Sequence, residues 1–285
     1  MFLIPNSRIT RGLIRKSQIY QDKSSSPFIS GDTYKSFCRI ELTNRFEDFF
    51  KSDTRKDSVF ISVNNLYQLV TWLKSNRWVL PRMETLVIHN GDVIPQVTDY
   101  YFLKSFFHKI FSVNWLGDSS VIAPLPIGLE NLSYLQNGVP SDFRNSISKI
   151  RLTWEERPIE ILVAFSDATN YNERRLARDS IQDISGIHQV NGMISPRIYR
   201  KLLSDSKFVL SPPGNGPDCH RTWEALYLGS IPIVKKQYWN FKALENNVVS
   251  LESWSDISTY GDLGKKPLEC PVNDLMQLYL KEFTI

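Results

Sequence analysis

Short continuous apolar runs alternate with helical apolar periodicity along this chain, and the alternation predicts an α/β protein. The runs predict strands at residues 28–33, 58–63, 85–88, 113–115, 121–127, 160–165, 208–210, 231–234 and 248–251. Apolar residues at helical spacing predict helices at 65–75, 99–111, 172–180, 196–204, 218–229 and 273–283, with partial helix in 34–50. Strands that alternate with helices are typical of parallel sheets joined by right-handed crossovers.

A polar stretch at residues 136–157 separates two sets of alternating elements. We therefore predict two Rossmann-like domains with a central cleft, at residues 1–135 and 136–265, and a closing C-terminal helix at 266–285. Residues 1–27 are polar and basic, which indicates an irregular arm. Ligands of open parallel sheets bind at the carboxyl ends of the strands, so residues that follow the strands are the candidates for chemistry.

Residues 208–234 carry the clearest chemical signal, because a strand, a Pro/Gly loop and a helix follow one another there. The free N–H groups and the positive end of a helix form an anion site, and glycines at 214 and 216 allow close backbone approach. Arg221 adds a positive charge that suits phosphate. Glu224 lies one turn further, where a carboxylate accepts hydrogen bonds from ribose hydroxyls. The plainer interpretation is a solvated surface pair of Arg221 and Glu224.

Polar residues follow three other predicted strands. Ser166, with Thr169 and Asn170, precedes a basic helix whose first turn holds Arg174, and a plain helix cap is the alternative. His89-Asn90-Gly91-Asp92 follows the strand at 85–88, and Ser30-Gly31-Asp32-Thr33 lies at the end of the first strand. A carboxylate or His at such a position is suited to accept a proton, whereas an Asn-Gly or Gly-Asp turn needs no function.

Composition changes this picture little. The 285 residues are 42% hydrophobic and 22% charged, as in ordinary soluble proteins. The net charge of +4 suits anionic substrates but is too small to demand a nucleic-acid partner, and none is expected. No run of about eighteen apolar residues occurs, so we expect no transmembrane segment. Met1–Pro5 is too short for a signal-peptide core, which leads us to expect a cytoplasmic location.

The cysteines do not indicate a further site. Cys38, Cys219 and Cys270 lie far apart, with no spacing typical of zinc and no disulfide framework. Cys219 is followed by His220, but adjacent residues of a helix point in different directions, which argues against a paired thiol nucleophile.

The helix with Arg221 resembles the nucleotide-sugar loop of exostosin-like glycosyltransferases and, more loosely, that of fucosyltransferases. The matching residues are Arg221, Glu224, Ala225, Leu226, Gly229 and Pro232. Weaker likenesses occur in the expected order at residues 30–33, at 89–92 (with Gly91 in place of a Ser) and at 125–131, which is similar to a Pro-x-Gly linker strand. The resemblance implies the GT-B fold, in which the first domain binds the acceptor and the second binds the sugar nucleotide.

The resemblance also implies an activity, namely inverting transfer from a UDP-sugar to the hydroxyl of an oligosaccharide or glycoprotein glycan. Arg221 and Arg174 would neutralise the diphosphate and Glu224 would bind ribose. The remaining donor contacts would be Gly214, Asn215, Gly216, Ser211 and Ser166, and the base would be Asp92, His89 or Asp32. No Asp-x-Asp triplet occurs, so neither a divalent metal nor another cofactor is expected.

Xylose is the leading donor sugar, since the chain resembles exostosin-like members encoded by large viruses, including a xylosyltransferase of glycoprotein glycans. Two other classes remain as alternatives. A nucleotide-binding regulatory or scaffold protein would keep the loop without catalysing transfer. An NAD-type dehydrogenase is disfavoured, because no strand is followed by Gly-x-Gly-x-x-Gly.

Overall fold

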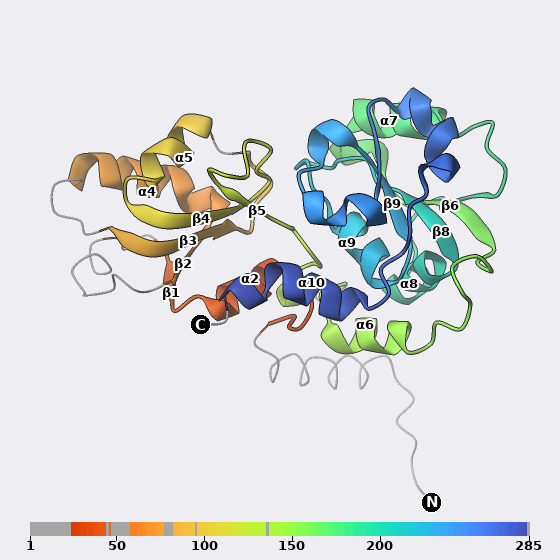
Figure 1. Cartoon of the computed structure of the whole chain (residues 1–285), viewed down its shortest axis with the longest axis horizontal. Coiled ribbons are helices and arrows are strands. Elements are labelled where there is room, and N and C mark those ends of the chain that lie inside the picture. The colour runs from red at the N-terminus through yellow and green to blue at the C-terminus, as the bar shows by residue number, and fades with distance from the viewer. Residues whose placement is uncertain are drawn as a thin grey trace, which may run out of the picture.

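The residues that the structure describes form two parallel sheets of five strands each, flanked by helices (Figure 1). The computed structural model describes residues 24–43, 46, 58–76, 82–94, 96–134 and 137–283. The predicted α/β class with two Rossmann-like domains is confirmed by this architecture. The exact domain bounds at 135 and 265 stay a prediction.

The first sheet has the strand order β1-β2-β3-β4-β5, so each strand pairs with the next one along the chain. Its strands are β1 (Ile40–Leu42), β2 (Ser58–Ser62), β3 (Met83–His89), β4 (Phe107–Val113) and β5 (Ala123–Leu125). Alternate residues of the strands face opposite sides. Ile61 and Leu86 pack with α4 (Val63–Asn76) and α5 (Val97–Leu103), while Phe60 and Val87 face a second core on the other side.

The second sheet has the order β10-β9-β8-β6-β7. Strand β7 is added on one side of β6, whereas β8, β9 and β10 are added on the other side, so the strand order reverses between β6 and β8. Its strands are β6 (Ile159–Val163), β7 (Ile187–Gln189), β8 (Ser206–Leu210), β9 (Ile231–Lys235) and β10 (Val249–Leu251). The helices α7 (Tyr171–Asp179), α8 (Pro196–Ser204) and α9 (His220–Tyr227) lie around it. A reversal of strand order opens a crevice at the carboxyl ends of the two strands, and this is where open α/β sheets bind ligands.

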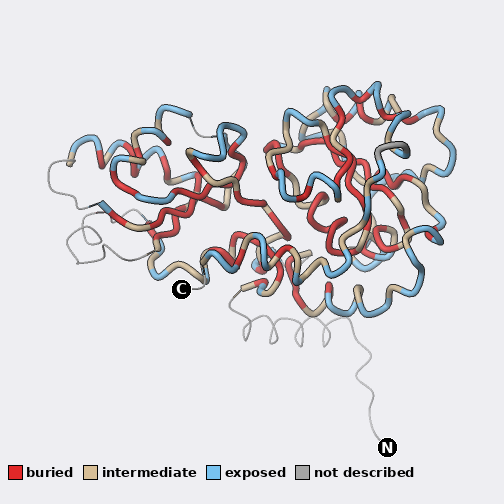
Figure 2. Tube along the Cα trace, viewed as in Figure 1, coloured by how far each residue is buried: buried red, intermediate tan, exposed pale blue. Residues whose placement is uncertain are grey.

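One hydrophobic core joins the two sheets. It contains Phe60 and Val87 of the first sheet together with Leu162 and Val209 of the second. The helices α2 (Gly31–Phe37) and α10 (Pro271–Tyr279) lie below the junction of the two halves in Figure 1, and Tyr34 of α2 and Leu275 of α10 belong to this core. Figure 2 shows buried segments in both sheets and at their junction. The remaining helical segments are α6 (Pro140–Ile147) and the 3-10 helices at Leu132–Tyr134, Asp167–Thr169, Lys236–Tyr238, Lys242–Asn247, Trp254–Leu263 and Lys281–Phe283.

Several predicted elements differ from the structure for physical reasons. The strand at 28–33 is reduced to a bridge between Ser30 and Leu129, because the Ser30 hydroxyl accepts the N–H of Thr33 and caps α2. The predicted helix at 99–111 ends at Leu103, and its second half is β4, which is paired on both sides by β3 and β5. Tertiary pairing there overrides the helical spacing.

Other differences are a matter of length. The predicted helix at 218–229 is shorter, since α9 begins at His220 and ends at Tyr227. The predicted strand at 113–115 is only the end of β4, because Asn114 has a left-handed backbone with φ 58°. The short strands β1 and β7 and the helix α6 were not expected from the pattern. Residues 1–23 of the predicted arm, and most of 44–50, lie outside the described residues.

None of the helices in the described ranges has the length and apolar character that crossing a bilayer requires.

Candidate functional site

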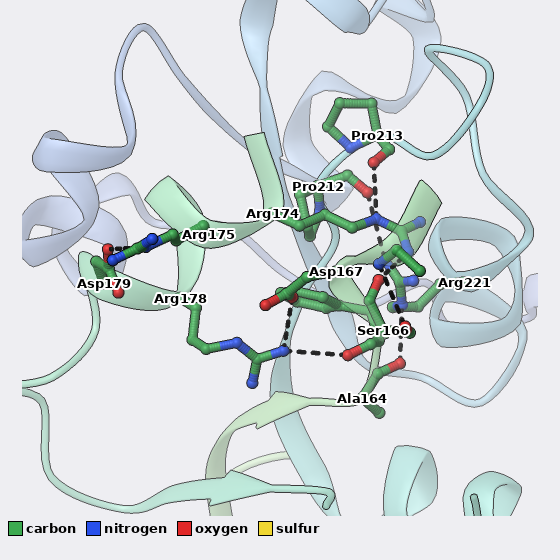
Figure 3. Close-up of polar contacts among 12 residues, drawn as sticks. Ala164, Ser166, Asp167, Arg174, Arg175, Arg178, Asp179, Pro212, Pro213 and Arg221 are labelled. Carbon is green, nitrogen blue, oxygen red and sulfur yellow. Dashed lines mark hydrogen bonds and ion pairs between the residues drawn. The ribbon is translucent and has the colours of Figure 1, made fainter. Parts of the chain in front are cut away.

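Two arginines meet at the reversal point of the second sheet (Figure 3). Arg174, from α7, donates its Nε–H to the carbonyl of Pro213 at 3.0 Å and a second N–H to the carbonyl of Ser166. Arg221, from α9, donates to the carbonyls of Ala164 at 3.3 Å and Pro212 at 3.4 Å. The carbonyls belong to the segments that follow β6 and β8, so the backbone of the crevice itself fixes both guanidinium groups.

These two positive charges have no carboxylate partner among the described residues. Both guanidinium groups lie over the ring of Phe165, at 5.7 Å for Arg174 and 5.0 Å for Arg221. Burial lowers the pKa of Arg174, and the charge of Arg221 lowers it further. Like charges held together without a salt-bridge partner favour an anionic ligand.

The other two arginines of α7 are arranged differently. Arg178 pairs with Asp167 at 2.9 Å, and Arg175 lies on the exposed side with Asp179 at 3.6 Å (Figure 3). Neither of them lines the cavity in which Arg174 and Arg221 lie. The three arginines of α7 thus have different surroundings: Arg178 is in an ion pair, Arg175 is in a surface pair, and Arg174 lies in the crevice.

A cavity of about 410 Å³ occupies the crevice. It is lined by Asp92, Ile127, Glu130, Tyr134, Asn137, Ala164, Thr169, Arg174, Tyr199, Gly214, Asn215, Gly216, Asp218, Cys219, His220, Arg221 and Glu224. The loop at 214–216 is held against the site, since Asn170 donates to the carbonyl of Gly214 at 3.2 Å. A Cβ on Gly214 would lie 3.0 Å from the Arg174 guanidinium, so glycine allows the loop and the arginine to approach closely.

Glu224 supplies a buried carboxylate to this cavity. Its side chain accepts a hydrogen bond from the Tyr199 hydroxyl at 2.9 Å, and the residue is only 4% exposed. Burial raises the pKa of Glu224 to about 7, while the bond from Tyr199 and the charge of Arg221 act in the opposite direction. One carboxylate oxygen is engaged by Tyr199, which leaves the other for hydroxyl donors of a ligand.

A second cavity, of about 420 Å³, lies at the carboxyl ends of the first sheet. It is lined by Asn64, His89, Asn90, Gly91, Asp92, Val93, Ile127, Asn131, Tyr134 and His220. Asn90, which follows β3, has a left-handed backbone with φ 55°, as has Asn114 after β4. Four residues line both cavities, namely Asp92, Ile127, Tyr134 and His220. The two cavities therefore share a wall where the halves of the molecule meet.

Asp92 lies on this shared wall. It is exposed, and its carboxylate accepts a hydrogen bond from the side-chain amide of Asn215 at 3.1 Å. The bond links the loop after β3 to the Gly-rich loop after β8.

His89 is instead buried, with 2% of the residue exposed, and it joins two backbone segments by hydrogen bonds. Its Nδ1 accepts the N–H of Asn90 at 2.8 Å, so Nε2 carries the proton and donates it to the carbonyl of Pro126 at 3.0 Å. Burial lowers the pKa of His89 to about 4. Both ring nitrogens are engaged, so neither is left to accept a proton from a substrate.

The three remaining candidates lie outside both cavities. The Asp32 carboxylate accepts the N–H of Leu132 at 2.7 Å, and burial raises the pKa of Asp32. Ser211 is 3% exposed and shares a hydrogen bond with the Thr222 hydroxyl at 2.9 Å. Ser166 caps the short helix at 167–169 and lines a neighbouring cavity of about 690 Å³.

The structure adds residues that the sequence pattern did not single out. Asp218 is buried, and its carboxylate accepts N–H groups of Ile127 at 2.8 Å, Cys219 at 2.8 Å and the Trp223 ring at 2.9 Å. Tyr199, His220 and Tyr134 also line the first cavity. For His220, the sequence signal is its position directly before Arg221, whereas its position next to Cys219 indicates no site.

One protein family matches part of the chain. Residues 181–252 match the RXYLT1 C-terminal domain, a xylosyltransferase-related family. The match covers about a quarter of the chain and spans β7, α8, β8, α9, β9 and β10. A search of curated proteins gives no match for the chain. The family match supports a xylosyltransferase-like glycosyltransferase, which implies a sugar donor and a glycan acceptor. It does not bear on the resemblance to virus-encoded members.

Proposed function

We propose that the protein transfers a sugar from a UDP-sugar, with UDP-xylose as the leading donor, to a hydroxyl of a glycan. The observation that carries this proposal is the pair Arg174 and Arg221, which lack carboxylate partners in the described chain and face a cavity at the reversal point of a parallel sheet. The cavity shares a wall with a second one. A donor in the first cavity would thus have its sugar close to an acceptor in the second.

The departing diphosphate is the group that the first cavity would stabilise. Arg174 and Arg221 supply positive charge, and the N-terminus of α9 supplies free N–H groups and the positive end of the helix dipole. The guanidinium groups are already fixed by backbone carbonyls, so little reorganisation is needed when negative charge develops on the leaving group. We propose on this basis that transfer proceeds without a divalent metal.

Glu224 is suited to bind the ribose of the donor, because it offers a buried acceptor within the same cavity. Ala164 and Tyr199 also line the neighbouring cavity of about 690 Å³, which extends along residues 189–194 after β7. We propose that the nucleobase lies there, on the far side of Tyr199 from the diphosphate.

The acceptor hydroxyl would lie at the wall shared by the two cavities. Tyr134 is 68% exposed and lines both cavities, and an exposed aromatic ring is suited to stack on a sugar. Of the three bases predicted from the sequence, Asp92 lines this wall, whereas His89 has both nitrogens engaged and Asp32 lines neither cavity. Attack from the second cavity on a donor in the first is consistent with inversion at the anomeric carbon.

A donor panel tests the proposal. The full chain is heated with UDP, GDP or CMP, each alone and as a sugar nucleotide, in the presence of EDTA and then of Mg²⁺. UDP and UDP-xylose are expected to raise the melting temperature through mass action, and slow release of xylose should follow in both conditions. No stabilisation by any nucleotide sugar would refute the proposal. Stabilisation by UDP without release or transfer from any donor would favour a nucleotide-binding scaffold.

A further inference from the structure

His220 is fixed in one tautomer by its surroundings. It is the first residue of α9, and its Nδ1 lies 2.7 Å from the backbone carbonyl of Gly128. A carbonyl oxygen only accepts hydrogen bonds, so Nδ1 must carry the proton and the neutral ring has its lone pair on Nε2.

This Nε2 atom is available to a ligand. It has no hydrogen-bond partner among the described residues. It is also not fully buried, since it is absent from the unbonded side-chain atoms that solvent cannot reach. The residue lines both cavities. The lone pair of Nε2 is therefore accessible at the wall where the donor and acceptor cavities meet, in contrast to the two engaged nitrogens of His89.

The charges around His220 suit a group that is neutral at rest and gains a proton for a short time. Burial lowers the pKa of His220, while the hydrogen bond to the Gly128 carbonyl and, to a smaller extent, the carboxylates of Glu130 and Asp92 raise it. The neighbouring ring of His89 is neutral, and the positive end of α9 disfavours a permanent imidazolium. The two carboxylates would stabilise the imidazolium once a proton has arrived.

We propose that His220 is the general base of the transfer reaction and accepts the proton of the acceptor hydroxyl at Nε2. The inference rests on the proposed function and assigns its missing residue. As the hydroxyl oxygen forms its bond to the anomeric carbon, the bond from that carbon to the diphosphate oxygen breaks. The electron pair leaves with the diphosphate, the proton moves to Nε2, and solvent later removes it. Asp92 is a positioning residue in this account, which holds the imidazolium and the Gly-rich loop.

The substitution His220→Asn separates the two nitrogens of the ring. The side-chain amide of Asn occupies the place of Nδ1 and can donate to the Gly128 carbonyl, but nothing replaces Nε2. Transfer by the variant is expected to fall about 100- to 10,000-fold, as for loss of a general base. The stabilisation by UDP should stay within about threefold in apparent affinity. His188→Asn, on the exposed part of β7, is the matched control and should transfer like the wild type.

The pH profile gives a readout that a structural role would not change. The rate is measured at saturating UDP-sugar, so that the pH dependence of donor binding through Glu224 does not enter it. Under this condition, transfer by the wild type should decline on the acid side as His220 becomes protonated, and His220→Asn should lose this decline. A variant that transfers within about threefold of the wild type and keeps the acid decline would overturn the proposal. Loss of UDP binding along with transfer would also overturn it, since His220 would then serve the donor. If Asp92→Asn alone removes the acid decline, Asp92 is the base. Failure of the wild type to bind UDP would instead refute the proposed function.

Discussion

The two sheets are built from the same parallel pattern, but they differ in strand order. The first sheet adds each new strand on the same side, from β1 to β5, whereas the second turns back between β6 and β8. Only the second therefore has the crevice that a reversal creates, and it is here that two arginines lie without carboxylate partners in the described chain. The first sheet presents a loop with His89, Asn90 and Asp92 at its edge. The two sheets thus present different groups at their carboxyl ends, with arginines at the second sheet and neutral and acidic groups at the first.

Removing the guanidinium of Arg221 from the second sheet is expected to have the largest effect on activity. Arg221→Ala should lower kcat/KM with the sugar nucleotide about 100- to 1,000-fold, because one preorganised group that stabilises the leaving diphosphate is lost. Steady-state kinetics and UDP titration measure the loss. Arg175→Ala, which removes the surface arginine of α7, is the control and should be close to the wild type. Equal activity of Arg221→Ala and the control would remove the basis for a diphosphate site.

Removing the Asp218 carboxylate, which connects the two halves, is expected to have the next largest effect. Asp218→Ala would leave the N–H of Ile127, the N–H of Cys219 and the Trp223 ring N–H without their acceptor. A buried donor left unpaired costs about 1–3 kcal/mol, and only the Trp223 ring N–H is fully buried here, so the free energy of unfolding should fall by about 1–3 kcal/mol. Urea unfolding measures this fall. A change below about 0.5 kcal/mol, typical of an exposed position, would show that this carboxylate does not hold the halves together.

Glu224 gives a pH dependence with a defined sign. Its pKa is raised from 4.5 to about 7, so burial penalises the ionised form. The stabilising contribution of the protonated form is complete below about pH 4.5 and is lost as the pH rises through about 7. Glu224→Gln should therefore have a flatter pH dependence of unfolding across this window, measured by thermal denaturation.

The same group should act in the opposite direction on donor binding. The ionised carboxylate accepts ribose hydroxyls, so UDP affinity of the wild type should weaken as the pH falls below about 7. Titration of UDP at several pH values checks this, and the Glu224→Gln variant should bind weakly throughout. A wild-type affinity that rises as the pH falls would contradict the ribose assignment.

The smallest expected effect concerns the loop at 214–216. Gly214→Ala adds a Cβ that lies 3.0 Å from the Arg174 guanidinium, so the arginine must shift by a few tenths of an ångström. UDP affinity should fall about two- to fivefold, within the range of a displaced charged hydrogen bond. Gly261→Ala, where the new Cβ meets nothing within 4 Å, should leave affinity unchanged. No difference between the two variants would mean that the loop does not set the position of Arg174.

Local sequence signals single out residues that line the first cavity, but they do not indicate how the wall between the cavities is built. Arg174, Arg221 and Glu224 follow directly from strand, loop and helix within one stretch of chain each. The role of His220 depends on the carbonyl of Gly128, which lies 92 residues earlier, and no periodicity encodes that contact. Likewise, Asp32 has the local appearance of a base, but its carboxylate binds the N–H of Leu132, 100 residues away.

The fold shows the same difference between what local sequence patterns predict and what long-range contacts decide. Long apolar segments such as β3 and α4 are close to their predicted positions, because their faces pack on large cores. The residues of β4 also have helical spacing, and only pairing with β3 and β5 selects the strand. The short strands β1 and β7 contain polar residues, Glu41 in β1 and His188 with Gln189 in β7, so neither shows an apolar run that can be recognised.

The continuous core between the sheets has a mechanical consequence. The described chain passes from one half to the other at least three times. Ile29 binds the hydroxyl of Tyr227 before α2 begins, the linker with Gly128 follows β5, and Phe283 returns to pack on Phe111 with ring centroids 4.7 Å apart. Because the two halves are connected at three places, they cannot rotate apart about a single hinge without separating packed aromatic rings. Substrate entry and product release are therefore expected to rely on local movement of the loops around the two cavities, such as 212–217, and not on separation of the halves.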